Sequence, residues 1–116
     1  LQVLDLSENR LRTLPKGIFD RTPFLQTLDL GSNKLSELHV EVFAGLRNLQ
    51  RLDLGKNRLS ELPVEIWANL FAELTNLQTL NLRFNYLREL PADVWATLFS
   101  GLSNLQVLEL SGNQLS

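Results

Sequence analysis

The chain of 116 residues contains no cysteine and only one histidine, His39. Without cysteine it forms no disulfide and offers no thiolate for catalysis. It also has no glycine-rich phosphate loop and no metal-ligand cluster, so the sequence predicts a non-enzymatic protein with no cofactor and no metal. His39 stands at a turn position that elsewhere holds Pro15, Pro63 or Pro91, which favours a role in that turn over one as acid, base or ligand.

An excess of charge of one sign and long apolar runs are lacking as well. The 11 basic and 13 acidic residues give a net charge of −2. This balance argues against nucleic acid, or a membrane surface bound through bulk charge, as a partner. No apolar run approaches the roughly 18 residues that cross a membrane, so we expect no membrane insertion.

What the chain does contain is a repeat. Five segments fit the pattern LxxLxLxxNxL without a gap, and they begin at Leu1, Leu25, Leu49, Leu77 and Leu105. The first two intervals are 24 residues and the last two are 28, lengths that are typical of leucine-rich repeats. The pattern predicts one solenoid domain over residues 1–116, with units 1–24, 25–48, 49–76 and 77–104 and a partial unit 105–116.

Each segment alternates in the manner of a short strand. Its fourth and sixth residues, such as Leu52 and Leu54, share one face. Five parallel strands then give an α/β repeat fold: a curved sheet on the concave side, with short helices and 3-10 turns on the convex side. The ninth position is always asparagine, whose amide can satisfy backbone groups where the chain leaves the strand. This predicted structural ladder comprises Asn9, Asn33, Asn57, Asn85 and Asn113.

The longer units carry four extra residues, close to one helical turn. Their spacing predicts an extended amphipathic helix with an apolar face of Ile66, Trp67, Leu70, Phe71 and Leu74. We interpret the aromatic residues as core rather than as a ligand groove; they are Trp67, Phe71, Trp95 and Phe99. A thicker convex layer should curve the solenoid more tightly around the third and fourth units.

The shorter units resemble the typical subclass of animal extracellular leucine-rich repeats, which includes the Toll-like receptors and the variable lymphocyte receptors. The resemblance is carried by Leu14, Pro15, Ile18 and Phe19 in the first unit and by Leu38, Val42, Phe43 and Leu46 in the second. It implies recognition of a protein or glycan through the concave face, in an extracellular or cell-surface location.

The longer units depart from that subclass. Trp67 and Trp95 are interpreted as standing where the subclass has phenylalanine, and the unit length is similar to that of the cytosolic ribonuclease-inhibitor subclass. The cysteine-rich caps of extracellular relatives are also missing. An uncapped terminal strand, at Leu1 to Leu6 or at Leu105 to Leu110, offers unpaired backbone groups, so we expect that it could join two copies into a homodimer.

The outward positions vary most in the fourth unit. The fifth position forms an acidic row of Asp5, Asp29, Asp53, Asn81 and Glu109, and the tenth a basic edge of Arg10, Lys34 and Arg58 that continues as Tyr86 and Gln114. The fourth unit breaks the pattern of small or charged residues with Arg83, Phe84 and Tyr86, and Arg and Tyr are enriched in interface hot spots. The predicted ligand-binding site is therefore centred on these three residues, flanked by Arg51, Asp53, Arg58, Thr79 and Asn81. In the alternative, Phe84 packs against the turn beside Lys56.

Three functions remain open. The first is a binding module, immune-receptor-like, that recognises a protein or glycan through the concave sheet. The second is a structural or engineered repeat scaffold that self-associates through its ends. The third is a regulatory interaction domain of a larger intracellular protein, which the length of the longer units favours.

Overall fold

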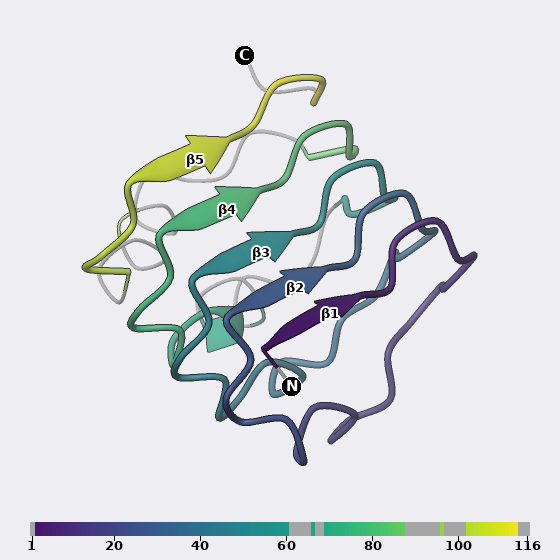
Figure 1. The fold of residues 1–116 in the computed structure, drawn as a ribbon. Coiled ribbons are helices and arrows are strands. Elements are labelled where there is room, and N and C mark those ends of the chain that lie inside the picture. Colours follow the sequence, from purple (N-terminus) through teal and green to yellow (C-terminus); the bar gives the residue numbers. More distant parts are fainter. Residues whose placement is uncertain (1, 61–65, 67–68, 88–95, 97–101, 114–116) are drawn as a thin grey trace.

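The fold is a parallel β-sheet coiled from five successive repeats, seen in a computed structural model. The structure describes residues 2–60, 66, 69–87, 96 and 102–113. The strands are β1 (Val3–Asp5), β2 (Thr27–Asp29), β3 (Arg51–Asp53), β4 (Thr79–Asn81) and β5 (Val107–Glu109). They pair in chain order, as Figure 1 shows. The predicted leucine-rich-repeat solenoid is confirmed.

Strand register follows the sequence period without slippage. Leu28 pairs with Leu52 and Leu52 with Leu80, and Asp29 lies beside Asp53 in the same way. The middle leucine of each inner strand is buried and its neighbours face outward, because successive strand residues point to opposite sides of the sheet. The outward side of the sheet, which we call the concave face, therefore presents its side chains at one strand spacing per repeat.

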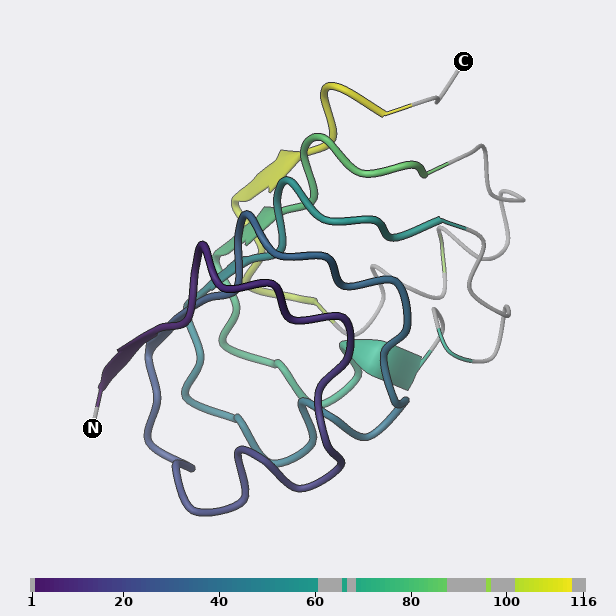
Figure 2. The ribbon, with the colours of Figure 1, turned by 90° about the vertical axis from the view of Figure 1, so that its right-hand side faces the viewer.

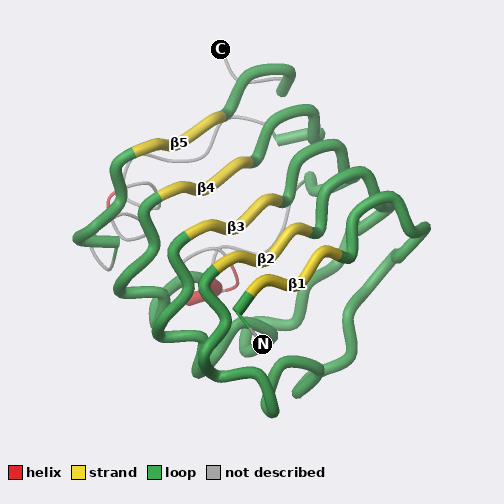
Figure 3. The backbone as a smooth tube through the Cα atoms, in the orientation of Figure 1, coloured by secondary structure: helices red, strands yellow, loops and turns green. Residues whose placement is uncertain are grey.

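The described residues of the convex side lie mainly in turns. Figure 3 shows loop connecting the strands over most of the described chain, and Figure 2 places the outer segments across from the sheet. Among the described residues helical backbone occurs only at Ile66, Asn69, Leu70 and Ala96. The predicted amphipathic face is present in part, since Leu70, Phe71 and Leu74 are buried and Asn69 is exposed.

A stack of phenylalanines joins the repeats beneath the convex side. The ring centroids of Phe19 and Phe43 are 6.3 Å apart, as are those of Phe43 and Phe71. Phe71 therefore takes the phenylalanine position of the third unit, and the prediction that Trp67 does so is wrong. The reason is that the four extra residues enter before the aromatic position: Phe71 precedes Leu74 by the same interval that separates Phe43 from Leu46. Trp67, Trp95 and Phe99 lie outside the described residues, as do most outer residues on which the predicted curvature depends.

The ninth-position asparagines bridge neighbouring repeats. Asn57 Nδ2 donates to the carbonyls of Leu30 at 3.0 Å, Leu54 at 3.0 Å and Gly55 at 3.1 Å, and its Oδ1 accepts from the Leu35 amide at 3.0 Å. Asn33 and Asn85 repeat this pattern of partners. Asn113 donates to the carbonyls of Leu82 and Leu110 and accepts from the Leu87 amide. Asn9 donates only within its own repeat, to Leu6 and Ser7. The inner asparagines thus replace the backbone pairing that is lost where the chain leaves the sheet.

Candidate functional site

A hollow of about 270 Å³ lies on the concave face, where the chain leaves strands β1 to β4. It is lined by Ser7, Glu8, Asp29, Gly31, Ser32, Asp53, Gly55, Lys56, Asn81, Arg83 and Phe84. We call it the concave hollow. It is smaller than most sites for drug-sized ligands, so its size suits a side chain of a partner.

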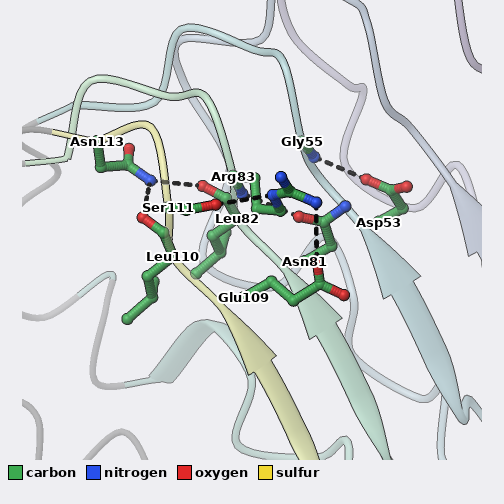
Figure 4. Close-up of polar contacts among 9 residues, drawn as sticks. All are labelled: Asp53, Gly55, Asn81, Leu82, Arg83, Glu109, Leu110, Ser111 and Asn113. Carbon is green, nitrogen blue, oxygen red and sulfur yellow. Dashed lines mark hydrogen bonds and ion pairs between the residues drawn. The ribbon is translucent and has the colours of Figure 1, made fainter.

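The fifth-position side chains shape this hollow by closing the same turn in successive repeats. One carboxylate oxygen of Asp29 accepts from the Gly31 amide at 2.9 Å, and one of Asp53 accepts from the Gly55 amide at 2.8 Å. Asn81 accepts from the Arg83 amide at 2.9 Å, as Figure 4 shows for the third and fourth repeats. Asp and Asn side chains commonly bond to the backbone two residues later. The residues of the acidic row therefore help to hold the turns, a structural role that the recurrence of Asp or Asn two residues before each turn amide indicates.

Two carboxyl groups of the row differ in their acidity. Loss of water around the Asp29 carboxylate raises its pKa, and the negative charges of Asp53, Asp5 and Glu8 raise it further. The hydrogen bond from the Gly31 amide partly offsets this by lowering the pKa. The side-chain and backbone hydrogen bonds from Ser7 lower the pKa of Asp5. The ionised carboxylate is therefore less favourable at Asp29, in the second repeat, than at Asp5, in the first.

Arg83 is held in place by three groups. Its Nε donates to Ser111 Oγ at 2.8 Å, its Nη1 lies 3.3 Å from Glu109 Oε2, and its guanidinium carbon is 5.2 Å from the centre of the Phe84 ring. Figure 4 shows the guanidinium between Asn81, Ser111 and Glu109. An arginine fixed in this way has lost much of its side-chain freedom before any partner arrives, which lowers the entropic cost of binding.

Phe84 has a strained backbone and an exposed ring. Its φ is 56°, a left-handed conformation that the eighth position also adopts at Glu8, Ser32 and Lys56, and that is unfavourable for a bulky side chain. Phe84 is 47% exposed. A Cβ added at Gly112 would lie 2.4 Å from the ring, so the ring packs against the turn of the following repeat, and Phe84 also lines the same hollow as Lys56.

The structure brings together four of the eight residues predicted for the site: Asp53, Asn81, Arg83 and Phe84 line the hollow. Arg51 and Thr79 pair with each other on the outward row of β3 and β4, outside the lining. Arg58 and Tyr86 lie farther along the loops, where their amides donate to Leu35 and Leu59. The sequence prediction missed Asp29 and the glycines Gly31 and Gly55, which leave the space open.

The lone histidine and the carboxylates are also candidates for catalytic or metal-binding groups. His39 is exposed on the convex side, and its Nδ1 accepts from the Glu41 amide at 3.0 Å, so it takes part in a turn. No group of three or more His, Cys, Asp or Glu residues in the described part of the chain is placed to hold a metal ion. Within that part, no helix is long and apolar enough to cross a membrane.

Comparison with known proteins gives the chain its family. Residues 1–59 match the family described as "Leucine rich repeat", residues 47–93 match "Leucine Rich repeats (2 copies)" and residues 101–116 match a further leucine-rich repeat. No curated protein sequence matches. A solved structure described as "Structure of the Toll - Spatzle complex, a molecular hub in Drosophila development and innate immunity (glycosylated form)" aligns with a TM-score of 0.86 and 30% identity. That alignment covers 99% of this chain and 14% of the Drosophila chain. The chain belongs to the leucine-rich-repeat family.

Proposed function

We propose that the chain is a non-enzymatic module that recognises a protein through its concave face, at a site centred on Arg83 and Phe84. The observation that carries this proposal is an exposed aromatic ring beside an immobilised guanidinium at the edge of a preformed hollow. Aromatic and arginine side chains in such settings supply much of the energy of protein interfaces. Protein interaction is also the role suggested by the family and by the relative solved as a Toll–Spatzle complex.

An extracellular or cell-surface location, with a role similar to that of an immune receptor, is part of the same proposal. It rests on the resemblance of the shorter units and on the 30% identity to the Drosophila chain. A glycan ligand and a regulatory role inside the cell are the alternatives, and pairing of a second copy with β1 or β5 stays a prediction. Sedimentation of the purified chain at increasing concentration tests that pairing.

A binding screen tests the proposed function. The chain is probed against panels of secreted proteins, cell-surface proteins and microbial glycans, and each hit is measured again with Arg83, Phe84 and Tyr86 all changed to alanine. We expect the triple variant to bind at least about tenfold more weakly. Single variants should show the larger losses at Arg83 and Phe84, because Tyr86 lies outside the hollow.

Phe24→Ala is the matched control. Phe24 is 70% exposed, precedes β2 and does not line the hollow. If the folded triple variant binds as tightly as the parent, or if Phe24→Ala causes the larger loss, the proposed site is wrong.

A further inference from the structure

The concave hollow contains two carboxylates, Asp29 and Asp53, that form no ion pair with any cation in the described part of the chain. Asp29 and Asp53 are register partners on β2 and β3. In each carboxylate Oδ1 accepts a hydrogen bond from a backbone amide. Neither carboxylate forms an ion pair among the described residues, where the pairs found are Lys16–Glu41, Arg47–Glu73 and Arg83–Glu109. Carboxylate oxygens accept more than one hydrogen bond each, so both groups keep unused acceptor capacity.

Glycine keeps the space between these carboxylates open. A Cβ at Gly31 would lie 3.1 Å from Oδ1 of Asp29 and 3.4 Å from Oδ1 of Asp53. One atom at that point therefore contacts both carboxylates at close to hydrogen-bonding distance. The equivalent point over Gly55 lies 3.1 Å from Asp53 Oδ1, 3.2 Å from Asn81 Nδ2 and 3.4 Å from the Arg83 carbonyl oxygen, so two carboxylates meet over Gly31 and only one over Gly55.

Neither cation that lines the hollow, Lys56 or Arg83, pairs with Asp29 or Asp53. Arg83 is held by Glu109 and Ser111 in the fourth and fifth repeats, and Lys56 forms no ion pair among the described residues. The raised pKa of Asp29, caused first by loss of water and then by the carboxylates around it, agrees with uncompensated negative charge. Phe84, at the other end of the hollow, belongs to its lining and is 47% exposed.

We infer that the concave hollow receives an arginine or lysine side chain from an extended segment of the partner protein. The charged head would lie over Gly31 between Asp29 and Asp53, and the aliphatic stem would run toward Phe84. The basis is shape and charge together: a hollow of about 270 Å³ that Asp29, Asp53 and Phe84 help to line, with an oxygen of each carboxylate within 3.4 Å of one point over Gly31. The inference rests on the proposed function, and it specifies the chemistry of the partner.

Peptides that differ by one functional group test the inference without a known partner. The probes are short, extended peptides of serine and glycine with arginine, citrulline or glutamate at the centre, titrated into the ¹⁵N-labelled chain. Citrulline keeps the shape of arginine without its charge. We expect the arginine peptide to shift the Gly31 and Gly55 amide signals and to bind about tenfold more tightly than the citrulline peptide, because hydrogen bonds between ions are stronger. Added salt should weaken that preference.

Charge-removing variants provide the matched controls. Asp29→Asn and Asp53→Asn keep the acceptor of the turn, as Asn81 does in the fourth repeat, and should abolish the preference for arginine. Asp5→Asn removes the same charge outside the hollow and should keep it. The inference is overturned if arginine and citrulline peptides bind alike, if neither binds at millimolar concentration, or if Asp5→Asn acts like Asp29→Asn. Such a failure would not overturn the proposal that a partner binds the concave face, because the binding screen tests that proposal separately.

Discussion

Phenylalanine serves two different purposes on the two sides of this solenoid. Beneath the convex side Phe19, Phe43 and Phe71 stack at one ring per repeat and are at most 3% exposed. On the concave side Phe84 stands alone, 47% exposed, on left-handed backbone. A side chain that recurs with the period belongs to the core that neighbouring repeats share. One that interrupts the period is the place to look for a specialised surface.

The largest expected effect is the difference in unfolding free energy between removing a buried and an exposed phenylalanine. Phe43→Ala removes the middle of a fully buried stack and should lower the free energy of unfolding by about 3–5 kcal/mol. Phe84→Ala should lower it by less than about 1 kcal/mol, because about half of Phe84 already faces solvent. Urea unfolding measures both variants. Equal losses would contradict the division between core and surface.

The asparagine ladder sharpens the comparison, since the same residue type is buried in inner repeats and exposed in the first. Asn57→Ala should cost about 3 kcal/mol, because it orphans buried carbonyls and the Leu35 amide. Asn9→Ala should cost about 1 kcal/mol, because its partners Leu6 and Ser7 are within reach of water. Denaturant midpoints with unchanged slopes would report these differences. A larger loss for Asn9→Ala would show that the ladder does not act between repeats.

Gly112 tests how Phe84 is held. Gly112→Ala should cost about 2 kcal/mol, because φ is +78° and the new Cβ would meet the Phe84 ring. In a Phe84→Ala background the clash disappears and only the backbone strain of about 1 kcal/mol remains. A double-mutant cycle isolates the contact between the two residues. Strict additivity would mean that the ring does not lie on Gly112 in solution.

The smallest expected effect concerns Asp29 and pH. Its raised folded-state pKa means that the native state binds the proton more tightly than the unfolded state does, so stability falls as pH rises from the ordinary value of 3.8 through the raised value. Asp29→Asn should therefore stabilise the chain at pH 7 by a few tenths of a kcal/mol, since solvent screens much of the repulsion. Unfolding of parent and variant from pH 3 to 7 checks this. If the stability advantage of Asp29→Asn over the parent shrinks as pH rises, the pKa of Asp29 is not raised in the folded state.

Much of the fold was predictable from the sequence because a repeat fixes register. The leucines of the fourth and sixth positions and the ninth-position asparagines occur in every unit, so one assignment applies five times. The position of the four-residue insertion depends on the direction of counting: forward from Leu62 gives Trp67 as the aromatic position, and back from Leu74 gives Phe71. The packing of Phe71 on Phe43 decides between them.

The site was predictable only in part. Comparing positions found Arg83 and Phe84 because they break the pattern. It missed Asp29 and Gly31 because they obey it: a regular residue becomes part of a site only through the space that its neighbours leave. Tyr86 breaks the pattern too, yet its loop position places it outside the hollow.

Amide hydrogen exchange, with and without a protein partner found in the screen, tests the central claim most directly. A second hollow, of about 410 Å³, lies on the convex side between Val40, Ala44 and Leu70 and provides the internal comparison. Recognition through the concave face predicts that the partner slows exchange at Gly31, Gly55 and Phe84 and leaves Val40 and Ala44 unchanged. Slowed exchange at Val40 and Ala44, with Gly31, Gly55 and Phe84 unaffected, would contradict it.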